Sequence, residues 1–235
     1  MSGLGRGDLP TGEAKGTAVR AMFDAIAPRY DLVNRVMTFR MDVGWRRRTV
    51  EVLRLQPPAL VVDAACGTGD LCRALEEAGH RAVGLDFSAG MLAAANTSAP
   101  LVQGDALALP FRDGVIDGIT CGFALRNVVS LPRLFSEAAR VLRDGGRIAL
   151  LEVGRPRAAM PRALHSIYFN RVVPLIGGVL SDRAAYSYLP RSAAYLPDEE
   201  GLASLLHEAG FVRHSFTTLG LGAAQVISAT RRARS

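Results

Sequence analysis

The chain contains few cysteines and almost no lysine. Its 235 residues hold three cysteines, Cys66, Cys72 and Cys121, and this odd number favours reduced thiols over a disulfide framework. No histidine lies near them at the spacing of zinc ligands, so we expect no metal site. Lys15 is the only lysine, and arginine carries nearly all of the positive charge behind the net charge of +6. These features predict a cytoplasmic protein.

Long apolar runs are also missing. No stretch of about 18 apolar residues occurs, so no membrane-spanning helix is expected. The opening segment "MSGLGRGDLPTGEAKG" is polar and has no apolar core of a secretory signal, and we expect residues 1–17 to be a disordered tail. The basic cluster "WRRR" at 45–48 is either a solvated face or a surface attracted to anionic membrane or nucleic acid.

A hydrophobic content of 49% is enough for one full core, and we predict a single domain over 18–235. Residues 18–55 have helical periodicity and predict an N-terminal helical cap, with Pro28 breaking the first helix. From residue 60 onward, short apolar strands alternate with helical segments. Strands are predicted at 60–64, 81–86, 100–103, 115–121 and 146–152, and helices at 70–78, 88–97 and 131–143. This alternation is typical of an α/β fold with a parallel, doubly wound sheet.

The chain ends with a helix and two strands, near 211–217 and 223–230, that can form an antiparallel edge. Residues 158–197 are an insertion that the alternating pattern does not need. The insertion contains four of the five tyrosines and the apolar run "VVPLIGGVL". We interpret it as a helical lid over a substrate pocket, with simple core packing as the alternative.

A glycine turn follows the first strand, in "VVDAACGTGD" at 61–70. Gly67 and Gly69 allow the main chain to approach a nucleotide-like ligand closely. The third glycine of a dinucleotide fingerprint is missing, because Cys72 occupies its place. Asp63, four residues before Gly67, would repel a pyrophosphate but suits a ligand with positive charge. The pattern therefore favours S-adenosylmethionine over NAD.

Acidic residues also follow the next two strands. Asp86 ends the second strand, 23 residues after Asp63, and a carboxylate there can accept hydrogen bonds from ribose hydroxyls. Ser88 is the expected N-cap of the following helix. Asp105 and Ala106 come after the third strand, at the same edge of the sheet, where they could contact adenine.

Several longer stretches carry a resemblance to a known family. "FDAIAPRYDLVN", "LPFRDGVIDGITCGFALRNV", "RVLRDGGRIALLE" and "VVPLIGGVLSDRAAYSYLPRS" together resemble the ubiquinone/menaquinone-biosynthesis C-methyltransferase family from about Met22 to Phe211. The resemblance implies a Rossmann-like class I methyltransferase that methylates a ring carbon of a prenylated quinol, such as demethylmenaquinol. A substrate of this kind implies possible peripheral contact with the membrane, for which Trp45 is either an anchor or a core residue.

The resemblance also implies roles for individual residues. Thr68, Asp86 and the pair Asp105–Ala106 would contact the cofactor, and we place Tyr30 and Cys121 beside it. Arg126 would stabilise the phenolate of the quinol, with a structural salt bridge as the alternative. Asn127 would orient the ring hydroxyl or its own loop, and His165 and Tyr188 are candidate proton acceptors.

Some positions depart from the family pattern. Gly122 replaces a serine, His165 replaces a tyrosine, and the C-terminal "TLGLGAAQVISATRR" has Gly220 and Ile227 where the family has threonine and histidine. These changes leave open a second possibility, methylation of a soluble aromatic compound or natural product. A non-catalytic cofactor-binding component of a complex is the third. Nucleic acid is not an expected partner, because the region after the fourth strand lacks the Asn-Pro-Pro-aromatic pattern of base-amine methylation. The oligomeric state is not indicated by the sequence.

Overall fold

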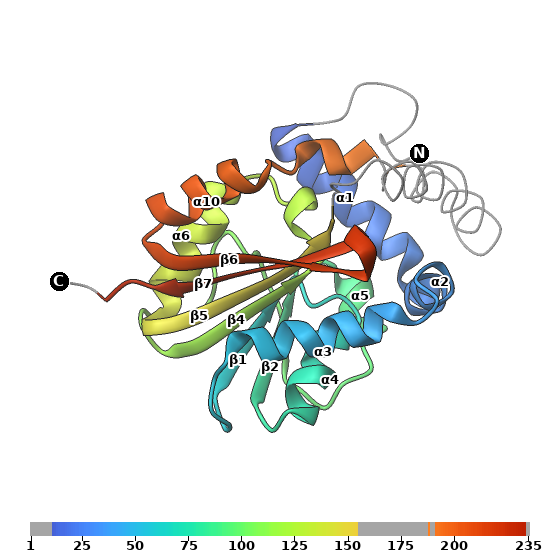
Figure 1. Ribbon diagram of the computed structural model, residues 1–235. Coiled ribbons are helices and arrows are strands. Elements are labelled where there is room, and N and C mark those ends of the chain that lie inside the picture. Colours follow the sequence, from blue (N-terminus) through green and yellow to red (C-terminus); the bar gives the residue numbers. More distant parts are fainter. Residues whose placement is uncertain (1–10, 155–187, 189–190, 234–235) are drawn as a thin grey trace.

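The computed structural model describes residues 11–154, 188 and 191–233 of the chain. At its centre is a seven-stranded sheet with the order β3-β2-β1-β4-β5-β7-β6 (Figure 1). The strands are β1 (Leu60–Ala64), β2 (Arg81–Asp86), β3 (Leu101–Gln103), β4 (Ile116–Gly122), β5 (Leu142–Val153), β6 (Phe211–Leu219) and β7 (Ala224–Arg231). Neighbours from β3 to β5 pair in parallel, and β7 pairs antiparallel with both β5 and β6. The predicted α/β fold with a mostly parallel seven-stranded sheet is confirmed.

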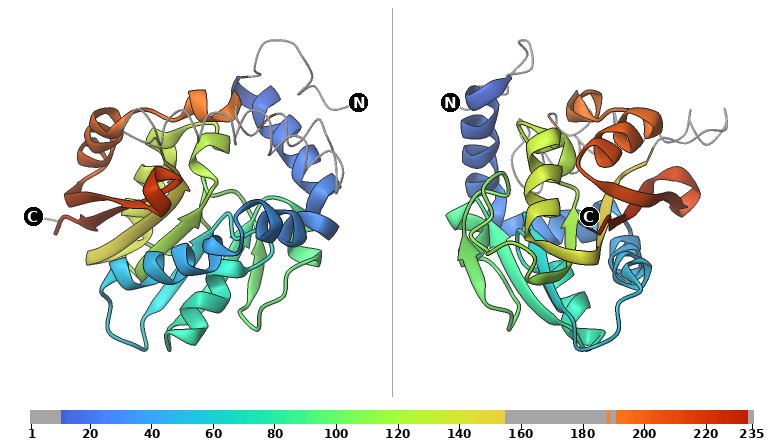
Figure 2. Two further views of the ribbon diagram at one scale, coloured as in Figure 1. Left: turned by 45° about the vertical axis from the view of Figure 1, so that its right-hand side comes forward. Right: turned by 90° about the vertical axis from the view of Figure 1, so that its left-hand side faces the viewer.

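Helices cover both faces of this sheet. The described helices are α1 (Gly12–Ile26), α2 (Tyr30–Met37), α3 (Met41–Leu53), α4 (Asp70–Glu77), α5 (Ala89–Ala93), α6 (Leu131–Val141) and α10 (Glu199–Glu208). Short 3-10 turns are η1 (Ala27–Arg29), η2 (Leu125–Asn127), η4 (Ala193–Tyr195) and η5 (Gly220–Gly222). In Figures 1 and 2, α3 and α4 lie on one side of the sheet, and α6 and α10 on the other.

The strands alternate their side chains between two cores. In β1, Val61 belongs to the core that contains Leu53 of α3, whereas Val62 belongs to the core that contains Phe135 of α6 and Leu206 of α10. All five side chains are almost fully buried. Burying one such side chain contributes about 1.5–3 kcal/mol, so the two-sided apolar pattern fixes the strand between its helix layers.

Most predicted boundaries lie within a few residues of the observed ones, and the exceptions have local causes. Helix α1 begins at Gly12, inside the segment predicted to be a disordered tail over 1–17. It ends at Ile26, two residues before Pro28, as predicted. Helix α5 is shorter than the predicted 88–97, and its N-cap is Ser88, whose Oγ accepts a hydrogen bond from Met91 N at 3.0 Å.

The fifth strand is longer than predicted. The segment "RDGG" reads as a turn, but β5 begins at Leu142 and passes through it, with Gly145 at φ +74°. The pairing with β4 shifts register between Ile116 and Gly118, which accommodates this irregular segment. Of the predicted insertion at 158–197, only Tyr188 and residues 191–197 are among the described residues.

Candidate active site

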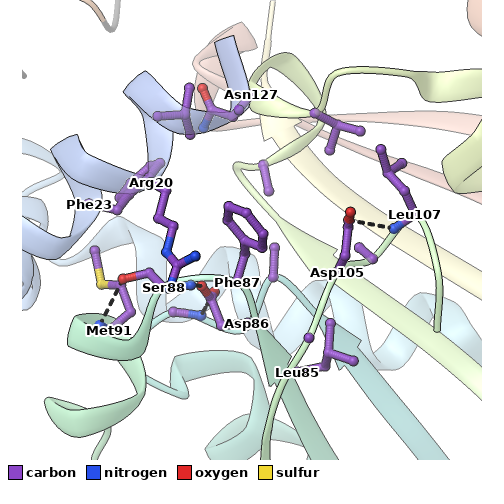
Figure 3. A pocket seen from close by; sticks show the side chains of 18 of the residues that line it. Arg20, Phe23, Leu85, Asp86, Phe87, Ser88, Met91, Asp105, Leu107 and Asn127 are labelled. Carbon is purple, nitrogen blue, oxygen red and sulfur yellow. Dashed lines mark hydrogen bonds between the residues drawn. The ribbon is translucent and has the colours of Figure 1, made fainter. Parts of the chain in front are cut away.

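A cavity lies at the carboxyl ends of the parallel strands, the usual ligand site of such sheets. It contains about 910 Å³ of empty space, part of which is open to solvent. Figure 3 looks into it: Arg20 and Phe23 come from α1, Asp86 and Phe87 follow β2, and Asp105 lies on the opposite side. Most of the lining is apolar. Its polar groups lie at the strand ends and in the segments that follow them, except Arg20 and Tyr30, which lie on the N-terminal helices.

Asp86 is the carboxylate that the structure places best for a ligand. Its Oδ2 accepts a hydrogen bond from Gly67 N at 2.7 Å, and its Oδ1 accepts one from Ser88 N at 2.8 Å. Burial raises the pKa of this carboxyl above its usual value, although these backbone donors oppose the effect. A carboxylate offers about four lone-pair positions, so each oxygen of Asp86 can accept one further hydrogen bond.

Asp105 and Ala106 also line the cavity, as predicted. The Oδ1 of Asp105 accepts a hydrogen bond from Leu107 N at 2.8 Å, which holds the loop after β3 in a turn (Figure 3). Asp63 differs from these two carboxylates because it does not line the cavity. It is buried, and Thr120 Oγ1 donates a hydrogen bond to it at 2.8 Å. Burial raises the pKa of Asp63 to about 7.

The two glycines of the turn have different tasks. Gly67 lines the cavity at φ +55°, and a Cβ built on it would meet no heavy atom within 4 Å. Gly69, at φ +83°, does not line the cavity, and its Cβ would lie 2.7 Å from Thr97 Cγ2. Gly67 therefore leaves space for a ligand, whereas Gly69 allows close packing. Thr68 is buried, does not line the cavity, and donates a hydrogen bond to Asp31 of α2.

The turn η2 carries two of the four residues predicted for catalysis, Arg126 and Asn127. Asn127 lines the cavity, and its Nδ2 donates to Phe123 O at 3.3 Å. The buried Oδ1 of Asn127 has no hydrogen-bond partner among the described residues. Arg126 does not line the cavity; its guanidinium forms an ion pair with Glu152, and its Nε donates to Ser192 Oγ at 3.2 Å. The salt-bridge alternative for Arg126 is therefore present in the structure.

Two further positions at the end of β4 differ from expectation. Cys121, placed beside the cofactor by the sequence, is buried and does not line the cavity. Burial raises the pKa of its thiol well above the usual value, so it is an unreactive core residue. Gly122 does line the cavity, and a Cβ there would lie 2.9 Å from Leu71 Cδ1. The hydroxyl that the family pattern has at this position would therefore require Leu71 to move.

The N-terminal helices form a second wall of the cavity. Tyr30 lines it, as predicted, and burial raises the pKa of its phenol. Sequence reasoning missed Gly16 of α1, because residues 1–17 were expected to be a disordered tail, and Val19, because an apolar helical residue fits core packing equally well. It also missed Phe87 and Met91, whose apolar character is as consistent with core packing as with a ligand.

The basic cluster at 45–48 is only partly a solvated face. Arg46 is buried and forms ion pairs with Asp42 and with Asp70, the latter at 2.8 Å. Arg35 joins the same network through Asp70 at 2.9 Å, so these charges fasten α2 and α3 to the start of α4. Trp45 is half-buried, and its ring centroid lies 6.4 Å from that of Phe123. Trp45 therefore packs against the core, as one of its two predicted roles requires.

Of the two predicted proton acceptors, only Tyr188 can be placed. It is fully buried, and its hydroxyl has no hydrogen-bond partner among the described residues. Burial raises its pKa to about 12, so the phenol stays protonated at neutral pH and cannot accept a proton. His165 lies outside the described residues.

Neither a metal cluster nor a membrane span is found in the described part of the chain. No group of three or more His, Cys, Asp or Glu residues there could hold a metal ion. Within the same ranges, no helix is long and apolar enough to cross a membrane. The three cysteines are buried and free.

Comparisons with known proteins agree with this architecture. The chain is 41% identical over 232 residues to the demethylmenaquinone methyltransferase of Roseiflexus castenholzii, covering 95% of this chain and 98% of that protein. It is 40% identical over 223 residues to the ubiquinone/menaquinone biosynthesis C-methyltransferase UbiE of Geobacter sulfurreducens, covering 88% and 86%. A solved SAM-dependent methyltransferase of Thermotoga maritima, described as a possible histamine N-methyltransferase, shares the fold with a TM-score of 0.66. It is 19% identical and covers 91% of this chain and 100% of that one.

A family model covers almost the whole chain. The model of the ubiE/COQ5 methyltransferase family matches residues 11–231, from the start of α1 to the end of β7. The match includes the cavity and both of its walls. The chain belongs to the ubiE/COQ5 methyltransferase family.

Proposed function

We propose that this protein transfers the methyl group of S-adenosylmethionine to a ring carbon of a prenylated quinol, converting demethylmenaquinol to menaquinol. The observation that carries the proposal is the cavity formed by Gly67, Asp86 and Asp105 at the carboxyl ends of the strands. The relatives named above are demethylmenaquinone and ubiquinone/menaquinone methyltransferases, which is the activity expected here.

The residues around the cavity fit an adenosyl group with a positive charge. Asp86 keeps lone pairs for ribose hydroxyls beyond the backbone donors it already binds. The open space beside Gly67 lets the main chain approach the ligand. The carboxylates of Asp86 and Asp105 attract the positive charges of an ammonium and a sulfonium, and they would repel a phosphate. When bound there, S-adenosylmethionine supplies an electrophilic methyl group.

The apolar part of the cavity suits the second substrate. Phe23, Val128 and Val129 line it near Asn127, at the same end of β4. Apolar walls favour a prenylated aromatic ring over a charged acceptor, because transfer of apolar surface from water is favourable. This asymmetry between a polar strand edge and an apolar wall supports a quinol acceptor.

Methyl transfer to carbon requires an ionised ring hydroxyl. A free phenol has a pKa near 10, so reaching neutral pH requires about 3 pKa units, or about 4 kcal/mol. We propose that the unpartnered Oδ1 of Asn127 accepts a hydrogen bond from the quinol hydroxyl that stays protonated and so orients the ring. The positive charge of Arg126 lies one residue away and favours the phenolate from behind the cavity wall. The quinol proton leaves to water or to His165, since Tyr188 stays protonated.

An anaerobic methyl-transfer assay tests this proposal. The protein is incubated with isotope-labelled S-adenosylmethionine and chemically reduced demethylmenaquinol, and mass spectrometry locates the label. We expect the label on a ring carbon, and we expect Asn127→Ala to lose most of the activity while it still binds S-adenosylhomocysteine. If the cofactor binds and the quinol never acquires label, the quinol is not the substrate. Soluble aromatic acceptors are then the next candidates.

We also propose that the protein acts in the cytoplasm, in peripheral contact with the membrane that holds its substrate. Leu32 and Val36, one turn apart on α2, are 57% and 41% exposed, and Met41 at the start of α3 is 44% exposed. Arg40 and Arg47, both exposed, lie on the same helical hairpin. Apolar and basic side chains together favour an anionic bilayer surface.

Vesicle flotation tests the membrane contact. We expect the protein to float with vesicles that contain anionic lipid, and we expect the double substitution Leu32→Ser/Met41→Ser to reduce the bound fraction several-fold. Val115→Ser is the matched control, because Val115 is 48% exposed but lies just before β4, at the amino ends of the strands, whereas α2 lies at the cavity end. Equal binding of all three proteins would exclude this surface.

A further inference from the structure

Helix α1 runs along one wall of the cofactor cavity and is fastened at both ends. Four of its residues line the cavity, namely Gly16, Val19, Arg20 and Phe23. The fastening residues, Lys15 and Asp24, lie on either side of these four. They are nine residues apart, about 13–14 Å along the helix, which is comparable to the length of an adenosyl group.

The Asp24 end is attached to the start of α5. The Oδ1 of Asp24 accepts hydrogen bonds from Ser88 Oγ and from Gly90 N, the latter at 3.0 Å. A Cβ on Gly90 would lie 3.0 Å from the Cα of Asp24, so the two backbones approach as closely as a glycine permits. This end of α1 is a packed, two-point attachment to the same segment that follows Asp86.

The Lys15 end is attached to two segments distant in sequence. Its Nζ donates a hydrogen bond to Val128 O at 2.8 Å, in the loop directly after Arg126 and Asn127. The same Nζ lies 3.8 Å from the ring centroid of Tyr195 on η4, within range of a cation–π interaction. Figure 1 shows this end of α1 beside the orange segment that contains η4.

Burying the lysine that makes these contacts costs free energy, because a charged amine is taken out of water. Only 5% of Lys15 is exposed, and burial lowers the pKa of its amine from 10.5 to about 8. It is the only lysine in a chain whose other cations are arginines. An arginine keeps its charge throughout the accessible pH range, whereas this amine can lose its proton under mildly alkaline conditions. At neutral pH the amine carries a charge that its burial disfavours, so the attachment at Lys15 is the weaker of the two.

We propose that α1 is a strap across the cofactor cavity, in which Lys15 is the positioning residue that holds the strap closed and Asp24 marks the end that stays attached. Release of Lys15 from Val128 and Tyr195 opens the wall formed by α1, so that S-adenosylmethionine enters and S-adenosylhomocysteine leaves. The proposal rests on the proposed function, since it takes this cavity as the cofactor site. It adds that the rate of cofactor exchange is limited by release of the Lys15 amine from its two contacts.

The charge state of Lys15 sets how firmly the strap is held. The charged and titratable groups on the elements around it are Glu13 on α1 itself, Arg126 on η2, Tyr195 on η4, and Arg191 just before η4. Deprotonation of Lys15 removes the cation–π interaction with Tyr195, although a neutral amine still donates to Val128 O. Because burial lowers the pKa of this amine, its charged form disfavours the closed strap and deprotonation removes that cost, so the strap is held more firmly as the pH rises through about 8.

Dissociation of radiolabelled S-adenosylhomocysteine tests the strap directly, in a pulse–chase experiment that needs no quinol. We expect Lys15→Met to dissociate about tenfold faster than the wild type at pH 7, and Lys15→Arg to retain most of the slow dissociation. Wild-type dissociation should slow between pH 7 and pH 9, as the buried amine loses its charge, whereas that of Lys15→Arg should change little, because arginine stays protonated. Arg81→Met is the matched control: it removes one exposed cation at the opposite end of β2.

The outcomes separate this proposal from the function it rests on. Faster release from Lys15→Met, with the wild-type pH dependence lost in both variants, supports the strap, and a merely structural lysine would not produce that pH dependence. Release from Lys15→Met at the wild-type rate, or a wild-type rate that does not change with pH, overturns the strap and leaves the proposed function standing. If wild-type protein does not bind S-adenosylhomocysteine at all, both proposals fail.

Discussion

The buried ion pair between Arg126 and Glu152 offers the sharpest test of how this site is built. Arg126 is 5% exposed and Glu152 is fully buried at the end of β5. The carboxylate of Glu152 also accepts a hydrogen bond from Val153 N at 2.8 Å and one from Arg126 N at 3.3 Å. Removal of the guanidinium leaves this carboxylate buried without its cation.

The expected magnitude follows from that burial. Breaking a buried pair by removing one partner costs about 3–5 kcal/mol in the free energy of unfolding. For a chain of 235 residues, each kcal/mol shifts the melting temperature by about 2–4 °C, so Arg126→Met should lower it by roughly 6–20 °C. Arg48→Met is the control, because the pair Arg48–Glu51 is exposed and contributes only about 0–1 kcal/mol.

A double variant separates stability from catalysis. Arg126→Met/Glu152→Gln removes both charges but keeps a side-chain acceptor for one of the two backbone N–H groups, and we expect it to regain at least half of the lost stability in urea unfolding. It should bind S-adenosylhomocysteine but transfer methyl groups at least tenfold more slowly, because the phenolate has lost its positive neighbour. An unchanged melting temperature in Arg126→Met would refute the ion-pair reasoning. Full activity in the double variant would refute the catalytic role and leave Arg126 a structural residue.

Three further predictions concern the strand edge. Asp86→Ala should raise the Kd for S-adenosylhomocysteine at least 100-fold in titration calorimetry, because about 1.5–3 kcal/mol is lost for each charge-assisted hydrogen bond. An unchanged affinity would show that Asp86 does not belong to the cofactor site. Gly67→Ala and Gly69→Ala should each lower the melting temperature by roughly 2–8 °C, because both residues have positive φ. Gly69→Ala should lower it further, because only its Cβ meets Thr97, whereas Gly67→Ala should also weaken cofactor binding; identical behaviour of the two variants would contradict their different surroundings. Asp63→Asn should be equal in stability to the wild type near pH 4 and more stable above pH 7 in urea unfolding, because the native pKa of Asp63 is raised to about 7, whereas that of the unfolded chain is about 4. The difference should grow between pH 4 and pH 7 and stay constant above pH 7; a constant difference from pH 4 upward would argue against a raised pKa.

The sequence by itself determined the sheet and the edge at which the site lies. Short apolar strands that alternate with amphipathic helices can bury both faces only as a parallel, helix-covered sheet, so the order of elements followed from local periodicity. Asp86 and Asp105 could be placed in the cavity because the carboxyl ends of parallel strands meet at one edge. Ser88 was recognisable as an N-cap from its position alone.

What each of these side chains does depended on partners that are distant in the chain. Asp63 follows the same strand-end rule as Asp86, but it binds Thr120, 57 residues away, and is withdrawn from the cavity. Lys15 meets Val128 across 113 residues of sequence, and no local pattern marks it as a contact of the catalytic turn. Gly67 and Gly69 are equivalent in the motif, and only the folded chain shows that Gly67 lines the cavity whereas Gly69 packs against Thr97.

Periodicity and caps are local properties, so they can be read from neighbouring residues. A buried charged side chain points toward the opposite charge or hydrogen-bond donor that the fold brings within reach, because an unpaired buried charge is strongly unfavourable. That is why the sequence located the cofactor edge, while only the tertiary structure decided that Arg126 pairs with Glu152 and that α1 closes the cavity beside it.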